Sequence, residues 1–85
     1  MSKGSSVEKA GRTLVFGEML KVLRRREQLT QKALAELLDI TDASVSLYES
    51  GKRLPGRKTI SKLPKALNLT SNEFILMIDV AEQSG

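Results

Sequence analysis

Apolar residues recur at helical spacing along most of this chain, beginning at about Thr13. Four of them fall at positions i, i+3, i+4 and i+7, namely Phe16, Met19, Leu20 and Leu23. Such a stripe is the buried face of an amphipathic helix, here ending near Gln28. No stretch alternates apolar with polar residues as a half-buried strand does. The pattern therefore predicts an all-α fold.

Two short helices follow, each behind a threonine that can cap it. The first is predicted over Gln31–Leu38 behind Thr30 and the second over Asp42–Ser50 behind Thr41. A threonine hydroxyl can accept a hydrogen bond from a free N–H of the first turn. Gly51 ends the second helix, since glycine readily adopts a positive φ. The side chains expected to be buried are Leu34, Leu37, Leu38, Val45 and Tyr48. Two helices separated by three residues have the spacing of a helix-turn-helix.

The rest of the pattern predicts a fourth and a fifth helix. The fourth covers about residues 58–67, and Pro64 should kink or split it because proline lacks the N–H that a helix interior needs. Thr70 and Glu73 form a capping box at the start of the fifth helix, which continues through the apolar run 74–81. The expected result is a compact five-helix domain.

The length of 85 residues provides one modest core, so we predict a single domain over residues 13–82. Residues 1–12 are rich in Ser, Gly and Lys and have no periodicity. We expect them to be flexible, with a basic arm that lies on DNA as the alternative. The chain has no Cys and no His, which removes thiolate and imidazole metal ligands and the commonest general base. No metal, cofactor or small-molecule ligand is expected.

Charge is unevenly distributed, although the net charge is only +4. Residues 9–65 carry 13 of the 14 Lys and Arg but six of the ten Asp and Glu, whereas residues 66–85 carry three acids and no base. A basic body favours a polyanion partner. No apolar run approaches the ~18 residues of a membrane span, and residues 1–12 lack the apolar core of a secretory signal. The expected location is cytoplasmic, away from membranes.

The segment from Leu29 to Leu69 resembles the lambda-repressor-like, or Xre-type, DNA-binding domain. The matching motifs are LTQ at 29–31, LA at 34–35, VS-x-YE-x-G-K-R-LP at 45–55 and KALNL at 65–69. The resemblance covers about residues 16–78. It implies a helix-turn-helix over residues 31–51 that binds double-stranded DNA, with the second of its helices in the major groove.

The resemblance also implies a role for individual residues. The positions that face DNA bases are Asp42, Ala43, Ser44 and Leu47. The positions that contact phosphates are Gln31, Ser50, Lys52, Arg53 and Arg57. Arg24 and Glu49 match a pair that forms a structural salt bridge between the first and third helices. Lys58 and Lys62 are expected to be solvated charges, and Tyr48 is expected in the core.

Two departures from the family pattern affect these expectations. Asp39 stands where glycine is usual, and it should preserve the turn because aspartate tolerates left-handed backbone better than most residues. The four base-facing positions hold none of the Arg, Lys, Asn or Gln side chains that bind bases in a bidentate manner. We therefore expect phosphates to supply most of the affinity, and methyl contacts and DNA shape to supply specificity.

The last predicted helix is apolar nearly all round, which is more than one packed face requires. Four of its residues are predicted to form a homodimer interface: Phe74, Ile75, Leu76 and Ile78. The alternative is that Phe74, Met77 and Ile78 complete the core and the other apolar side chains are tolerated at the surface.

The expected function is that of a sequence-specific DNA-binding transcription regulator, in the form of a homodimeric repressor on a palindromic operator. A phage repressor, a restriction–modification controller and an antitoxin all remain open within this class. The alternative is a protein-interaction module or antitoxin-like partner with the same fold. An enzyme is disfavoured because the sequence has no His, no Cys and no glycine-rich phosphate loop.

Overall fold

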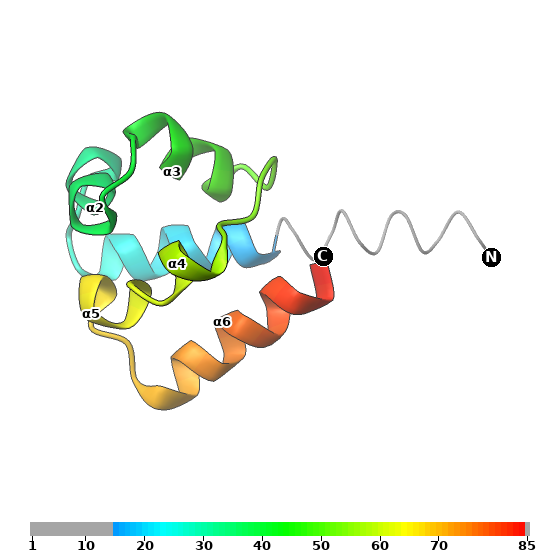
Figure 1. The fold of residues 1–85 in the computed structure, drawn as a ribbon. Helices are drawn as coiled ribbons and strands as arrows, with labels where there is room; N and C mark the ends of the chain where they lie inside the picture. Colours follow the sequence, from blue (N-terminus) through cyan, green and yellow to red (C-terminus); the bar gives the residue numbers. More distant parts are fainter. Residues whose placement is uncertain (1–14, 85) are drawn as a thin grey trace.

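The computed structural model describes residues 15–84 of the chain, which form helices without any strand (Figure 1). A first helix spans residues 15–26. It is followed by α2 (Gln31–Leu38), α3 (Asp42–Glu49), α4 (Arg57–Ile60), α5 (Leu63–Leu67) and α6 (Ser71–Ser84). The all-α prediction is confirmed. The predicted flexible segment, residues 1–12, and the predicted start of the domain at Thr13 lie outside the described residues.

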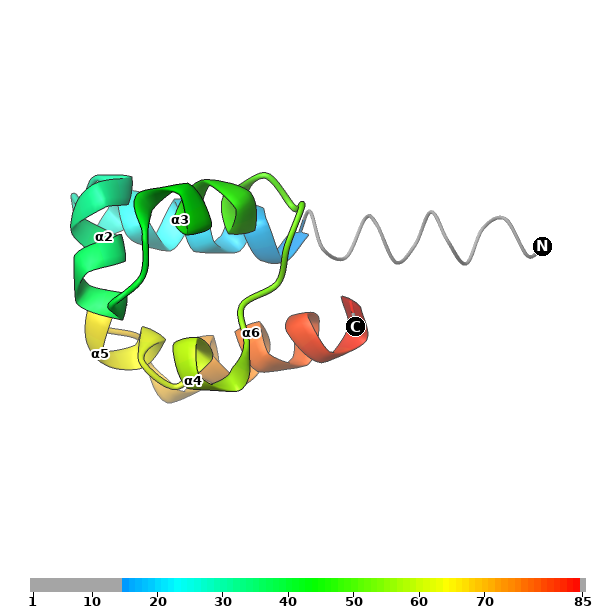
Figure 2. The ribbon, with the colours of Figure 1, turned by 45° about the horizontal axis from the view of Figure 1, so that its top comes forward.

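The first helix runs through the middle of the molecule. Figures 1 and 2 show α2 and α3 on one side of it and α6 on the other, and α4 and α5 lie on the α6 side. Every helix except α4 contributes buried apolar side chains to the core between them, and α4 packs its half-buried Ile60 against that core. The largest fully buried ones are Phe16, Leu20, Leu34, Leu38, Val45, Leu63, Leu67 and Met77. This core fixes α3 with one face inward and the other exposed.

The helix-turn-helix has the predicted caps and turns. The hydroxyl of Thr30 accepts a hydrogen bond from the N–H of Ala33 at 3.0 Å, and that of Thr41 accepts one from Ser44 at 3.1 Å. Asp39 ends α2 with φ 59°, and Gly51 follows α3 with φ 79°. The aspartate therefore occupies the left-handed region in place of a glycine, as expected.

Pro64 splits the predicted fourth helix into α4 and α5. The first part ends at Ile60 and the second begins at Leu63, so that Pro64 lies in a first turn, where a backbone N–H has no helical partner to lose. Lys62 lies between the two parts, and its Nζ donates a hydrogen bond to the carbonyl of Leu38 at 3.2 Å. The expectation of a solvated Lys62 is therefore wrong, because the last carbonyls of α2 need donors from outside the helix.

Two further details differ from the prediction. Leu37 was expected to be buried but is 54% exposed. At 3.6 residues per turn, Leu34 and Leu38 define the inward face of α2, and Leu37 falls to one side of it. The first helix ends at residue 26, two residues earlier than expected, because Gln28 has φ 60° and cannot continue it.

The start of α6 is joined to the first helix by a side chain that the sequence did not single out. The predicted capping box is present, because Glu73 accepts from the N–H of Thr70 at 2.9 Å and its own N–H donates to the Thr70 hydroxyl at 3.1 Å. The Arg26 guanidinium donates to Glu73 at 2.6 Å and to the carbonyl of Leu67 at 3.0 Å. One arginine thus connects the first helix to the end of α5 and the start of α6.

Gly17 marks the closest approach between the first helix and α3. A Cβ atom at this position would lie 2.6 Å from the carbonyl oxygens of both Tyr48 and Glu49. Any larger side chain would push the first helix away from α3. The sequence signal was a lone glycine within a helical stripe, which often marks close backbone packing.

Candidate nucleic-acid interface

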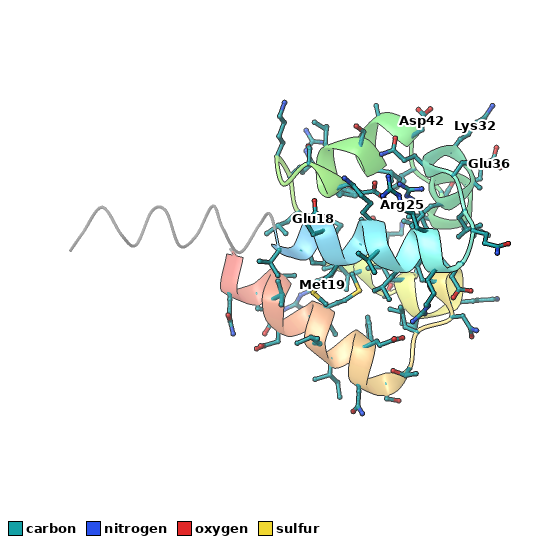
Figure 3. All side chains as sticks on the ribbon, turned by 180° about the vertical axis from the view of Figure 1, so that it is seen from behind. Glu18, Met19, Arg25, Lys32, Glu36 and Asp42 are labelled. Atoms are coloured by element: carbon teal, nitrogen blue, oxygen red, sulfur yellow. The ribbon has the colours of Figure 1, made fainter. Side chains whose placement is uncertain are left out.

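The exposed face of α3 contains the residues expected to face DNA bases. Asp42 and Ala43 are exposed, and Ser44 and Leu47 are half-buried. Figure 3 shows Asp42 extending away from the body of the protein. The opposite face of α3 packs into the core through Val45, Tyr48 and Glu49. The core therefore sets which side chains of α3 a duplex could meet.

Some polar side chains on this face already form hydrogen bonds within the protein. The hydroxyl groups of Ser44 and Thr41 are 3.0 Å apart and share a hydrogen bond. Ser46, which was not among the predicted contacts, is exposed and lies three residues after Ala43 on the same face. This face combines small, weakly selective hydroxyls with aliphatic groups, as the sequence had implied.

Arg24 and Glu49 form the salt bridge that the family resemblance implied. The Arg24 Nε donates to one carboxylate oxygen of Glu49 at 2.6 Å, and an Nη donates to the other at 3.0 Å. A second Nη donates to the carbonyl of Leu29 at 2.8 Å. Arg24 is 8% exposed and Glu49 3%. This arginine therefore fixes the first helix, the segment before α2, and the end of α3 relative to one another.

The hydrogen bonds of Glu49 keep its charge in a buried place. Burial alone would raise the pKa of this carboxyl, but the hydrogen bonds from Arg24 and Gln31 outweigh that effect and hold the pKa below its ordinary value. The hydrogen bond to Glu49 correspondingly raises the pKa of the Arg24 guanidinium. Both groups are charged at neutral pH, so the pair carries no net charge.

Gln31, a predicted phosphate contact, is attached to this pair. Its Nε2 donates to the Glu49 carboxylate at 3.1 Å. The bond places the start of α2 beside the end of α3, so the structure brings Gln31 close to the segment that begins at Ser50. The sequence alone gave no sign that Gln31 contacts Glu49.

The other predicted phosphate contacts follow α3. Ser50 is exposed, but its hydroxyl donates to the carbonyl of Leu47 at 3.1 Å and would have to leave that partner to bind a phosphate. Lys52, Arg53 and Arg57 are exposed, and within residues 15–84 none of them forms an ion pair. Their charges are therefore available to an anion.

Two more cations lie near the helix-turn-helix and were not predicted as contacts. Figure 3 shows Lys32 of α2 extending outward, and Arg25 on the side of the first helix that faces α3. Both side chains are exposed. Arg25 comes from a helix whose sequence pattern points to core packing, so only the fold reveals its position.

The predicted dimer residues of α6 do not share one face. Ile75 and Leu76 are 63% and 53% exposed, whereas Phe74 and Ile78 are half-buried. Phe74 and Ile78 line a groove toward Leu54 and Ile60, and Leu76 lines another toward Val15 and Val22 of the first helix. Met77, which one sequence alternative placed in the core, is fully buried.

The part of the chain that the structure describes holds no group of three or more side chains suited to bind a metal ion. No helix in that part is long and apolar enough to cross a membrane.

Comparison with known proteins finds helix-turn-helix transcription regulators among the relatives of this chain. The helix-turn-helix family model HTH_3 matches residues 20–74. The chain is 39% identical over 62 residues to the SPbeta prophage-derived uncharacterized HTH-type transcriptional regulator YonR of Bacillus subtilis. These 62 residues make up 73% of this chain and 56% of YonR. It is 42% identical over 55 residues to the HTH-type transcriptional repressor RghR of the same species, 64% of this chain and 41% of that one. The chain thus spans about half the length of these relatives.

A solved structure has the same fold. The restriction-modification controller protein C.AhdI from Aeromonas hydrophila superposes with a TM-score of 0.69 at 31% sequence identity, over 76% of this chain and 94% of that one. The matched family consists of DNA-binding transcription regulators and not of enzymes. The buried Arg24–Glu49 pair, the capped α2 and α3, and these matches lead to one conclusion: this chain belongs to the lambda-repressor-like, or Xre-type, helix-turn-helix family.

Proposed function

We propose that this chain is a cytoplasmic transcription repressor that binds a palindromic operator as a homodimer. The observation that carries the proposal is the surface around α3. An exposed helix face with small side chains is followed by Lys52, Arg53 and Arg57, whose charges have no acidic partner within residues 15–84. A helix in the major groove with cations beside it on the phosphates is the binding mode of such domains.

The side chains of α3 favour base contacts that add little affinity, so other residues would supply most of it. Ala43 and Leu47 would contact thymine methyl groups, and Ser44 would bond base edges with little selectivity. Asp42 would accept from a cytosine amino group, while it repels nearby phosphates. Gln31, Lys52, Arg53 and Arg57 would then supply most of the affinity, with Ser50 joining them if its hydroxyl leaves Leu47. Specificity would depend on methyl contacts and on DNA shape.

Homodimer formation is supported by the exposed apolar side chains of α6. Exposed Ile75 and Leu76 side chains on a small domain favour burial against another protein surface. Two-fold pairing of identical chains presents two copies of α3, which fits a palindromic site with half-sites about one helical turn apart. The repressor role draws its support from RghR, which is named a transcriptional repressor.

Selection of duplexes from a random library tests the proposal. The protein should enrich an inverted repeat rich in thymine at the positions that α3 covers, and footprinting should show two protected half-sites. Enrichment of a single unrepeated half-site would contradict the homodimer on a palindrome. Failure to retain any duplex at low salt would contradict DNA binding itself.

A further inference from the structure

The hydrogen bond between Gln31 and Glu49 has a consequence for DNA binding. We propose that Glu49, together with Arg24, is a positioning residue that orients the Gln31 side-chain amide toward a DNA phosphate. This proposal rests on the proposed function, because it concerns how Gln31 makes its contact. It assigns to a buried ion pair a role beyond holding helices together.

The carboxylate of Glu49 determines which way the Gln31 amide points. An ionised carboxylate only accepts hydrogen bonds, so the NH₂ group of the amide, and not its oxygen, must face Glu49. The 3.1 Å contact uses one of the two amide hydrogens. The second has no acceptor within residues 15–84 and remains free to donate to a phosphate. Glutamine at the start of a helix would otherwise sample several rotamers, and binding would have to select one.

Arg24 makes this arrangement compatible with DNA. A carboxylate beside a phosphate is repulsive, and Glu49 lies one hydrogen bond away from the proposed phosphate contact. The bidentate contact with Arg24, at 2.6 and 3.0 Å, neutralises that charge. The three side chains together therefore present an oriented donor with no net negative charge.

The fixed position of Glu49 is what allows it to act as an anchor. Its side chain is almost fully enclosed, and Arg24 is itself tied to the carbonyl of Leu29, two residues before Gln31. The support for the amide thus comes from the first helix, the segment before α2, and the end of α3. A glutamine held in this way loses less entropy when it binds.

A double-mutant cycle on duplex affinity tests the proposal. Dissociation constants for a labelled duplex would be measured by fluorescence anisotropy for the wild type, Gln31→Ala, Glu49→Gln and the double variant. Removing a hydrogen bond to a charged phosphate should weaken binding about tenfold in Gln31→Ala. Glu49→Gln should weaken the wild type about threefold, because a neutral partner orients the amide less firmly, and should not weaken Gln31→Ala further.

Removing a negative charge near DNA strengthens binding in general, so a loss in Glu49→Gln cannot come from net charge. Glu36→Gln is the matched control, because Glu36 is an exposed carboxylate on the outward side of α2 (Figure 3). It should leave affinity unchanged or slightly raised. If Glu49→Gln fails to fold, Glu49→Asp keeps the charge opposite Arg24 but withdraws the carboxylate from Gln31, and it should give the same pattern.

A second readout uses the free protein. The two side-chain amide protons of Gln31 should be widely separated in a ¹⁵N–¹H spectrum, because one donates to a carboxylate, and the separation should shrink in Glu49→Gln. If Glu49→Gln weakens duplex binding equally in the wild type and in Gln31→Ala, the positioning role is overturned and a structural role remains. No loss in Gln31→Ala, in a protein that binds DNA, would overturn the contact while the proposed function stands. No binding by the wild type would overturn both.

Discussion

The surfaces on the two sides of the first helix differ in what holds their side chains in place. At the helix-turn-helix, Glu49 is bound by Arg24 and Gln31, and the cations that follow α3 have no acidic partner among residues 15–84. On α6, Ile75 and Leu76 are exposed without a partner surface in a single chain. The first surface thus presents side chains held by hydrogen bonds beside exposed cations, whereas the second presents apolar side chains that a single chain leaves exposed.

Because the two surfaces differ in this way, DNA binding and self-association through α6 should respond differently to salt. Contacts between cations and phosphates release counterions and weaken steeply as salt rises. Burial of apolar side chains on α6 depends little on salt. Loss of a cation should therefore weaken DNA binding and leave self-association intact, whereas a change on α6 should weaken operator binding only through loss of the dimer.

The largest effect is expected when the buried ion pair loses one partner. Glu49→Ala should lower the free energy of unfolding by about 3–5 kcal/mol, because it leaves the Arg24 charge buried without compensation. Chemical denaturation measures this, with Glu36→Ala at an exposed carboxylate as the control. A loss below about 1 kcal/mol would show that the pair does not hold the helix-turn-helix together.

A somewhat smaller decrease in the free energy of unfolding is expected from Gly17→Ala. Alanine favours helices over glycine by about 1 kcal/mol, so propensity alone predicts a gain. The new Cβ would lie 2.6 Å from two carbonyl oxygens, and overpacking of this kind costs about 1–3 kcal/mol beyond that gain. Gly56→Ala is the control, since a Cβ there meets nothing within 4 Å. A more stable Gly17→Ala protein in thermal unfolding would contradict the close approach.

On the other surface, Leu76→Glu should weaken self-association by about 1–2 kcal/mol, because a charge would replace apolar area buried between copies. Sedimentation over a range of protein concentrations measures the change. Leu37→Glu is a matched control, because Leu37 is equally exposed but lies on α2. Equal effects of the two changes, or a monomeric wild type at tens of micromolar, would remove α6 from the interface.

The smallest effect is expected from a single phosphate contact. Arg57→Ala should weaken binding to every duplex alike by roughly 1 kcal/mol and reduce the salt slope by about one unit, because one cation–phosphate contact is lost. Lys65→Ala removes another exposed cation, on α5, and should change neither the affinity nor the salt slope. A sequence-dependent loss in Arg57→Ala would mean that this residue reads bases.

The sequence predicted most of the fold because each boundary has a local cause. Thr30 and Thr41 cap their helices through their own hydroxyls, and Pro64 cannot lie in a helix interior without removing a backbone hydrogen bond. Contacts between distant residues could not be predicted in the same way. Lys62 reaches the end of α2 and Arg26 reaches α6 only because the fold brings those ends together.

The candidate site was predictable in part for a similar reason. The resemblance gave positions on α3 and in the loop after it, since those roles are tied to motif spacing. It did not give the bond from Gln31 to Glu49, because 18 residues separate them and a glutamine at a helix start is usually solvated. Leu37 was predicted to be buried because it precedes Leu38, which is buried. The helix turn places Leu37 beside the inward face of α2, so it is exposed.

Titration of ¹⁵N-labelled protein with duplex DNA tests the central claim most directly. The concentration should be one at which α6 pairing is already saturated, so that only DNA contacts change. Amide shifts should then concentrate at the start of α2, along α3 and over residues 50–57, while α6 stays unchanged. Shifts confined to α6 and the first helix, or no shifts at low salt, would contradict the assignment of DNA binding to the helix-turn-helix surface.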